Sequence, residues 1–208
     1  MQVTLLTITP NAEKLIERAG RTAYQSVHKQ RPGSEKQFVR MLVKSGHYSV
    51  LEHANATFRI KDVSRAFTHQ FVRHRFCSFT QKSQRYVDEH NFGCVEPDSI
   101  SRNKKAHLLF KDFMRRAKRT YIELQKLNIK KEDARFVLPN AVESELVVTA
   151  NFREWRHIID TRGSPKAQWE IRQVAIGILK VLRRHAPTVF GDYQIDAKAG
   201  VIRRVKSE

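Results

Sequence analysis

Cysteine and long apolar segments are nearly absent from this chain. Its 208 residues include two cysteines, Cys77 and Cys94, whose spacing fits neither a metal-binding motif nor a disulfide framework. No apolar run approaches the roughly 20 residues of a membrane-spanning helix, and the first residues contain no apolar signal segment. These absences argue against a disulfide-stapled secreted domain and a membrane protein, and we expect a cytoplasmic protein.

Acidic residues are scarce relative to basic ones. The chain has 39 lysines and arginines against 21 aspartates and glutamates, which gives a formal net charge of +18. A positive field of this size raises the local concentration of anionic ligands, and it would also attract nucleic acid. The densest basic stretch, Arg102–Arg119, contains one acid, Asp112. Because Leu109, Phe113 and Tyr121 recur near helical spacing, we interpret the stretch as an amphipathic helix whose charged face meets solvent.

Helical and strand patterns alternate along the chain without a repeat or a linker. The pattern predicts a single α+β domain over residues 1–208, in which helices flank a mostly antiparallel sheet. We expect strands over residues 3–8, 54–60 and 143–152, and helices over residues 11–24, 34–46, 63–73, 102–119, 153–161 and 164–184.

Several residues are expected to mark the ends of these helices. Ser34, Asp62 and Ser164 precede helical patterns and are the predicted N-caps. Gly46 follows the second helix and is its predicted C-terminal cap. Residues 200–208 are basic and are expected to be frayed or peripheral.

The segment Arg73–Tyr86 is rich in groups that bind anions. Apart from the tyrosine, it contains three arginines, a histidine, two glutamines and three hydroxyl side chains. Guanidinium groups bind phosphate or carboxylate through paired hydrogen bonds, and hydroxyls, amides and backbone N–H groups complete such a site without adding charge. The segment therefore predicts a binding site for a phosphorylated small molecule.

The same segment resembles the signature of a known enzyme family. Arg73-His74-Arg75, followed after seven residues by Ser83, resembles the motif of the flavin-dependent thymidylate synthases. Further resemblance, in the same order along the chain, lies in residues 46–53, 134–139, 151–153, 157, 162 and 167–171. The resemblance covers roughly residues 47–172.

The resemblance implies a reductive methylation of dUMP to dTMP. The one-carbon unit would come from methylenetetrahydrofolate by way of reduced FAD, and NADPH would supply the electrons. The family's usual homotetramer, with active sites shared between subunits, would focus the positive field on these anionic ligands. The chain has no Gly-x-Gly-x-x-Gly fingerprint, which argues against a Rossmann FAD domain but not against a flavin held between subunits.

The resemblance also assigns site residues. Arg162 is the expected catalytic residue, because a fixed cation beside the uracil would stabilise negative charge that develops on the ring. The residues expected to contact dUMP are Gln70, Arg73, Gln81, Lys82, Ser83, Gln84, Arg85, Arg135 and Arg162. The residues expected to contact FAD are Ser49, Arg73, His74, Arg75, Gln81, Asn151, Arg153 and His157.

Residues near this site also suggest a serine nucleophile, a cysteine nucleophile and a metal site. Ser83 has cations and amides as neighbours, which suit phosphate binding better than nucleophilic catalysis. Two nearby arginines could lower the pKa of the Cys77 thiol, but the matching family position is not a nucleophile. The spacing of His47, His53 and His74 fits no zinc pattern, so we expect no metal.

Two alternative functions remain open at the level of sequence. A basic nucleic-acid-binding protein would explain the net charge of +18, but the chain contains no recognition module, and we do not expect nucleic acid to be its partner. Another flavin-dependent or nucleotide-dependent methyltransferase could use a related phosphate site, and comparison of dUMP with dCMP and UMP as substrates would separate the two enzymes.

Overall fold

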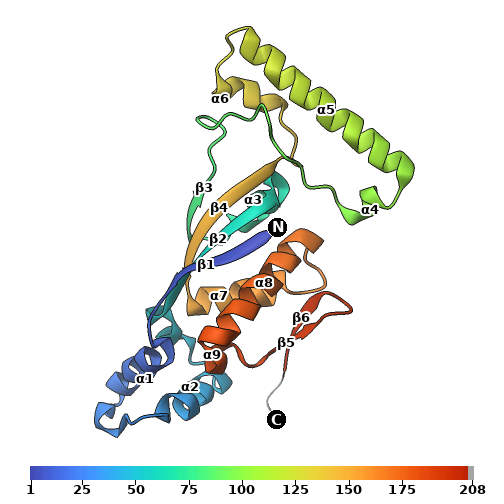
Figure 1. Ribbon diagram of the computed structural model, residues 1–208. Coiled ribbons are helices and arrows are strands. Elements are labelled where there is room, and N and C mark those ends of the chain that lie inside the picture. The colour runs from blue at the N-terminus through green and yellow to red at the C-terminus, as the bar shows by residue number, and fades with distance from the viewer. Residues whose placement is uncertain (206–208) are drawn as a thin grey trace. The chain divides into compact units, whose positions relative to one another are not determined.

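The computed structural model describes residues 1–205 (Figure 1). The chain folds into two compact units. The first unit consists of residues 1–2, 61–71 and 80–146, and the second consists of residues 3–60, 72–79 and 147 onwards. Helices and an antiparallel sheet confirm the α+β class. The expectation of a single domain over residues 1–208 stays a prediction.

The main sheet has four strands in the order β1-β2-β4-β3. Their bounds are Gln2–Ile8 for β1, Asn55–Ser64 for β2, Ser78–Gln81 for β3 and Glu143–Asn151 for β4. The amide of Thr9, just after β1, donates to the carbonyl of Asn55 at the start of β2. The amide of Phe152, just after β4, donates to the carbonyl of Ala54. Both contacts join the end of one strand to the start of β2, so β2 runs antiparallel to β1 and to β4.

The second unit contains most of the helices. Their bounds are Ala12–Ala23 for α1, Ser34–Lys44 for α2, Phe152–Arg162 for α7, Trp169–His185 for α8 and Pro187–Phe190 for α9, with 3₁₀ turns at Val27–Lys29 (η1) and Tyr48–His53 (η2). Within this unit, α7 packs against α8 and η2 (Figure 1). An antiparallel hairpin of β5 (Tyr193–Asp196) and β6 (Val201–Arg204) follows α9.

This hairpin corrects the expectation of a frayed end over residues 200–208. Val201 and Ile202 are buried, and the amide of Ile202 donates to the carbonyl of Gly163 directly after α7. A Cβ atom on Gly163 would lie 2.7 Å from the side chain of Ile202, so only glycine permits this close approach. Residues 206–208 lie outside the described part of the chain.

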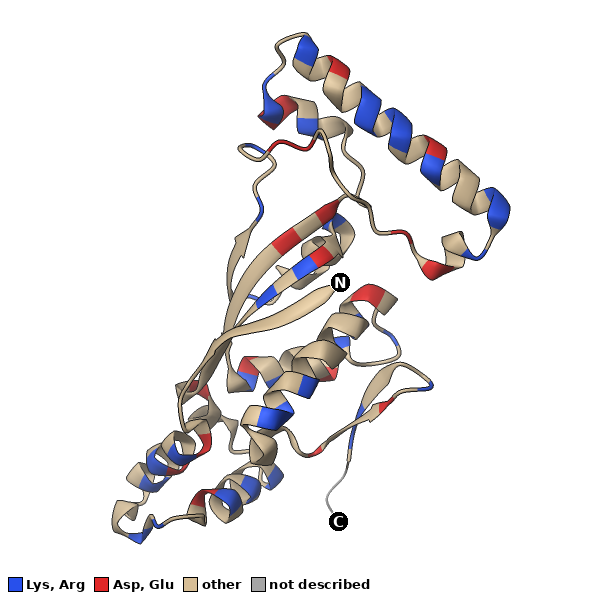
Figure 2. Cartoon of the chain, in the orientation of Figure 1, with Lys and Arg blue, Asp and Glu red and all other residues tan. Residues whose placement is uncertain are grey.

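The first unit contains α3 (Arg65–Phe71), α4 (Asp98–Ser101), α5 (Lys104–Lys126), α6 (Lys131–Ala134) and the 3₁₀ turn η3 (Arg135–Val137). The basic stretch is a helix, as predicted, and Figure 2 shows lysines and arginines along α5. Its buried residues, however, are Met114, Ala117 and Tyr121, whereas Leu109 and Phe113 are 74% and 52% exposed. The predicted apolar stripe is therefore right at Tyr121 and wrong at Leu109 and Phe113, because spacing alone does not show which of two overlapping stripes meets the core.

The predicted N-caps were wrong, although the helices they were meant to start are present. Gly33, at φ 85°, precedes α2, and Ser34 is the first helical residue. Asp62 lies inside β2, and the hydroxyl of Ser64 accepts the Phe67 amide at the start of α3. Ser164 does not cap α8, which begins at Trp169 rather than near residue 164; the cap is Gln168, whose side-chain oxygen accepts two backbone amides.

The C-terminal cap of α2 was predicted correctly. Gly46 has a φ of 71°, and the amide of His47 donates back to the carbonyl of Leu42. This arrangement satisfies a carbonyl at the end of the helix that would otherwise lack a partner. Among the described residues, no helix combines the length and the apolar character needed to cross a bilayer.

Trp155 fixes α7 against β2 in the core of the second unit. Its indole is fully buried and meets the ring of Phe58 edge-on at a centroid distance of 5.1 Å. The indole Nε1–H donates to the carbonyl of Ala56 at 3.2 Å. The side chain therefore supplies both apolar packing and a buried hydrogen bond that hold the helix in place.

We expect Trp155→Ala to lower the free energy of unfolding by about 3–5 kcal/mol, because it removes a buried aromatic side chain and leaves a cavity. Urea denaturation followed by circular dichroism measures this change. Leu109→Ala is the control and should change the free energy little, because Leu109 is 74% exposed. Equal effects of the two substitutions would contradict the placement of Trp155 in the core.

Candidate functional site

A cavity of about 510 Å³ in the second unit brings together most residues predicted to bind FAD. We call it the arginine cavity. Its lining residues are Glu52, Arg73, His74, Arg75, Phe76, Asn151, Arg153, Glu154 and His157. Six of these belong to the predicted FAD set. Of the other two, Ser49 lies exposed in η2, and Gln81 belongs to the first unit.

One wall of the cavity comes from the turn after α3. The helix ends at Phe71, so Arg73 and His74 do not continue it, and the prediction of a helix as far as Arg73 was wrong. Gln70 is on α3, as predicted. The amide of Cys77 donates to the carbonyl of His74, which closes a turn. The turn leaves Arg73 and Arg75 exposed while His74 is buried.

The opposite wall comes from the first half of α7. The side-chain oxygen of Asn151 accepts the Glu154 amide at 2.8 Å and so caps the helix at its first turn. Arg153 and His157 lie four residues apart on this helix and both line the cavity, as the sequence predicted. Arg153 also forms an ion pair with Glu52 at 2.6 Å, so the cavity holds a carboxylate next to an exposed guanidinium.

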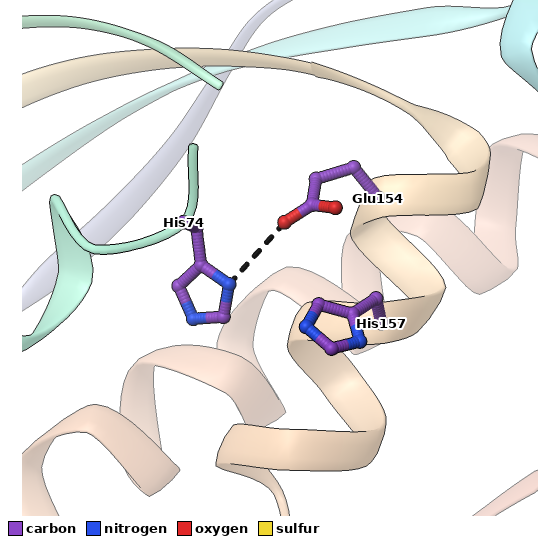
Figure 3. Close-up of side chains that lie close together, drawn as sticks. All are labelled: His74, Glu154 and His157. Carbon is purple, nitrogen blue, oxygen red and sulfur yellow. Dashed lines mark hydrogen bonds and ion pairs between the residues drawn. The ribbon is translucent and has the colours of Figure 1, made fainter. Parts of the chain in front are cut away.

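A buried histidine connects two charged groups at this site. The Nδ1 atom of His74 lies 3.2 Å from a carboxylate oxygen of Glu154, as Figure 3 shows. On the other side of the ring, Nε2 lies 3.0 Å from Nε of Arg162. His157 meets the His74 ring edge-on at a centroid distance of 5.6 Å. Burial, the charge of Arg162 and that of His157 lower the pKa of His74 to about 4, so the ring is neutral at physiological pH.

Arg162 is the last residue of α7 and is half-buried. Burial and the positive charge of Arg73 lower its pKa, but a guanidinium keeps its proton at physiological pH. Gly163, which follows it, holds β6 through its carbonyl. The predicted catalytic cation therefore stands on a fixed backbone and is bonded through Nε to His74.

Three of these side chains could together offer ligands to a metal ion. Among the described residues, His74, Glu154 and His157 form one such group, with one ligand atom from each within 4.8 Å of the others. The surroundings oppose a bound cation, because Arg73 and Arg75 line the same cavity. The expectation of no metal stays a prediction.

The predicted phosphate-binding residues lie in the first unit, in β3 and the turn that follows it. The amide of Val87 donates to the carbonyl of Ser83 at 2.9 Å, which closes this turn. Lys82 forms an ion pair with the buried Glu89 at 2.9 Å. Arg85 forms an ion pair with Glu132 at 3.0 Å. Both cations are therefore held by carboxylates, with which a phosphate would have to compete.

Arg135 and the two glutamines of this region have different surroundings. Nε of Arg135 donates to the carbonyl of Glu132 at 3.0 Å, so Arg85 and Arg135 share one residue as a partner. The Gln81 amide nitrogen donates to the hydroxyls of Thr68 and Ser144. Gln84 is only 6% exposed, and its amide nitrogen has no hydrogen-bond partner among residues 1–205. Of these three predicted contacts, Gln84 is thus the least accessible to a ligand.

Cys77 is not activated as a nucleophile. Burial, together with the negative charge of Glu154, raises the pKa of its thiol to about 12. The suggestion that nearby arginines lower this pKa was therefore wrong, since burial is the larger effect. The thiol is protonated at physiological pH, which agrees with a reaction that needs no thiol adduct.

The cavity also contains two acidic residues that the predicted site does not include, Glu52 and Glu154. The sequence leaves open whether Glu52 is a direct ligand or a structural residue, and in the structure it forms an ion pair with Arg153. The sequence pattern predicts no role for Glu154. Its only signal in the sequence was its place between Arg153 and His157, one helical turn before the histidine.

Comparison with known proteins identifies the family. Residues 4–188 match the family described as thymidylate synthase complementing protein. A flavin-dependent thymidylate synthase of Corynebacterium efficiens is 41% identical over 205 residues, covering 90% of this chain and 82% of the relative. The enzyme of the same name from Geobacter sulfurreducens is 40% identical over 200 residues, covering 92% and 86%. The one from Mycobacterium tuberculosis is 40% identical over 202 residues, covering 89% and 81%. With this match, and with the cavity that its signature residues line, the chain belongs to the thymidylate synthase complementing protein family.

Proposed function

We propose that this protein catalyses the reductive methylation of dUMP to dTMP. Methylenetetrahydrofolate is the one-carbon donor, FAD carries the methylene group and the hydride, and NADPH is the reductant. The names of relatives about 40% identical over most of the chain support this function. The observation that carries it is the arginine cavity, where six residues predicted from the family signature line one space.

The residues of the cavity fit a flavin dinucleotide. Arg73, Arg75 and Arg153 offer guanidinium groups that suit a pyrophosphate, and Asn151 and His157 offer further hydrogen bonds. When bound, the flavin supplies the redox and one-carbon transfer chemistry. The tasks left to the protein are to hold it, to orient the nucleotide and to stabilise charge.

We assign the phosphate of dUMP to the turn after β3. Lys82, Ser83 and Arg85 offer two cations and a hydroxyl there, and Gln70, Gln81, Gln84 and Arg135 complete the proposed set. A phosphate dianion carries more charge than the carboxylates of Glu89 or Glu132, so it can compete for Lys82 and Arg85. This competition would restrict tight binding to phosphorylated nucleosides.

Arg162 is the proposed catalytic residue. Attack by C5 of uracil on the one-carbon unit requires electron density to move from the ring nitrogen and carbonyl toward C5. A fixed guanidinium beside N3 or the carbonyl stabilises the negative charge of that electron distribution. The nucleotide is then activated without a covalent thiol adduct, consistent with the raised pKa of Cys77.

We propose a homotetramer with active sites shared between subunits. Two large apolar side chains support an assembly: Phe76 and Phe136 are 82% and 83% exposed in the single chain. Contact with another copy would remove them from water. Phe76 also lines the arginine cavity, so such a contact would lie at the proposed flavin site. We further propose that the enzyme works in the cytoplasm, where its two free cysteines would stay reduced.

The first test is flavin uptake. We expect the purified protein to bind FAD and to show a flavin absorption spectrum, and Arg153→Ala to weaken binding about tenfold or more, because it removes a charged donor. Titration of flavin fluorescence measures the affinity. Arg115→Ala on α5 is the control, since it removes an equal charge from an exposed surface. A folded wild-type protein that takes up no FAD would contradict the proposal.

The second test concerns Arg162. We expect Arg162→Ala to reduce dTMP formation about a hundredfold or more, because the charge that stabilises the activated ring is lost. FAD binding and the thermal unfolding midpoint should stay close to those of the wild type. Chromatography of the nucleotide products measures turnover. If Arg162→Ala forms dTMP at a near-normal rate, Arg162 does not have the role proposed for it.

A further inference from the structure

The hydrogen bond between Arg162 and His74 determines where the imidazole carries its proton. Arginine has N–H donors and no acceptor, so Nε of Arg162 can only donate. The His74 Nε2 atom, 3.0 Å away, must therefore accept with its lone pair. A neutral imidazole with a bare Nε2 carries its proton on Nδ1, and Nδ1 lies 3.2 Å from the Glu154 carboxylate. Arg162 therefore donates to His74, and His74 donates to Glu154.

Burial strongly favours this one arrangement of hydrogen-bond donors and acceptors. The side chains of His74 and Glu154 are 4% and 8% exposed, so water offers little substitute for a lost partner. The pKa of His74, lowered to about 4, agrees with a neutral ring that has one donor and one acceptor. If the proton moved to Nε2, two N–H groups would face each other at Arg162, and if the ring turned over, a ring C–H would face the N–H of Arg162 and leave it without an acceptor there.

Glu154 and Arg162, the two ends of this series of hydrogen bonds, lie on one helix. Glu154 lies in the first turn of α7, where its amide is held by the Asn151 cap, and Arg162 is the last residue. Arg162 follows Glu154 by eight positions, which is about 12 Å along a helix axis. Both side chains reach the same ring from opposite sides, so the helix and His74 together fix where the guanidinium of Arg162 lies.

We propose that Glu154 is a positioning residue for the reaction, an inference that rests on the proposed function. Its carboxylate holds the Nδ1–H tautomer of His74, and His74 in turn holds Nε of Arg162. The remaining N–H groups of a guanidinium lie on its two terminal nitrogens, so fixing Nε sets the direction in which they point. Glu154 thereby aims the catalytic cation at the uracil without touching the substrate.

Charge supports the same role. Burial and, to a smaller extent, repulsion by Arg73 lower the pKa of Arg162, and His157 lies close to the His74 ring. Glu154 is the carboxylate that contacts this group directly. It therefore offsets part of the repulsion that would push Arg162 out of position.

This hydrogen-bond arrangement also argues against a metal site formed by His74, Glu154 and His157. The ring nitrogen that faces Glu154 is Nδ1, the one that carries the proton. A metal ion bound there would require that proton to leave, while Arg162 still occupies Nε2. Neutral imidazole cannot meet both demands, because it must keep one proton.

Two substitutions separate positioning from simple loss of structure. Glu154→Leu removes the acceptor, and Glu154→Gln keeps an uncharged oxygen that can still accept from Nδ1–H. Asp160→Asn is the matched control, because it removes a carboxylate from an exposed position on the same helix. Three quantities are measured for each protein: the rate of dTMP formation, the affinity for dUMP without FAD, and the thermal unfolding midpoint.

We expect Glu154→Leu to lower kcat about tenfold to a hundredfold, as for loss of a buried hydrogen bond to a charged group. Glu154→Gln should retain most of the activity, and Asp160→Asn all of it. The affinity for dUMP should fall less than kcat, because the phosphate contacts lie elsewhere. Equal activities of Glu154→Leu and the control, in folded proteins, would overturn the proposal. Equal losses in kcat for the Gln and Leu variants would overturn the role of the acceptor.

The tautomer of His74 gives a readout that does not depend on turnover. In protein labelled with ¹⁵N-histidine, long-range NMR spectra distinguish protonated from bare ring nitrogens, and loss of a signal pair in His74→Asn assigns the residue. We expect Nδ1–H in the wild type and in Glu154→Gln, and a mixture in Glu154→Leu. A wild-type ring protonated on Nε2, or one whose Nδ1 binds added Zn²⁺ tightly, would overturn the inference.

Failure of the inference can be told apart from failure of the proposed function. If the wild type makes no dTMP, the proposed function is wrong, although the NMR result still shows which ring nitrogen of His74 carries the proton. If the wild type makes dTMP and Glu154→Leu does so equally well, the function stands and the positioning role falls.

Discussion

An arginine cannot accept a hydrogen bond, and this constraint organises the arginine cavity. It fixes the proton of His74 on Nδ1 and makes Glu154 the acceptor at the end of the chain. The histidine stays neutral because it is buried among positive charges. A neutral ring can hold a cation in place, whereas a protonated one would repel it. The proposed catalytic cation, Arg162, thus depends on a residue that the family signature does not include.

The excess of positive charge is used in different ways along the chain. On α5 it faces solvent, where Arg115 and Arg116 share Asp112 and contribute little to stability. Around the cavity, the guanidinium groups of Arg73, Arg75 and Arg153 line one space, so their attractions for the same anion add up. The net charge of +18 does not by itself show what the protein binds, because its effect depends on where the charged side chains lie.

Local patterns predicted much of the fold and part of the site. Alternating apolar residues predicted β2 and a run of β-branched residues predicted β4, and the four-residue spacing of Arg153 and His157 placed both on one helical face. The N-cap predictions failed because a serine or aspartate close to a helical pattern does not by itself mark the residue at which the helix begins, whereas the C-terminal cap at Gly46 was right. The β5 and β6 strands are four residues each, too short for a period to be read. Glu154 was missed because its partner, His74, lies 80 residues away in sequence.

The most direct measurement is tritium release from dUMP labelled at C5. The protein is incubated anaerobically with the labelled nucleotide, FAD, NADPH and methylenetetrahydrofolate. Because methylation replaces the hydrogen on C5, we predict that tritium enters water in step with the dTMP formed. A folded protein that has taken up FAD yet releases no tritium would contradict the claim that its fixed cations activate the uracil ring.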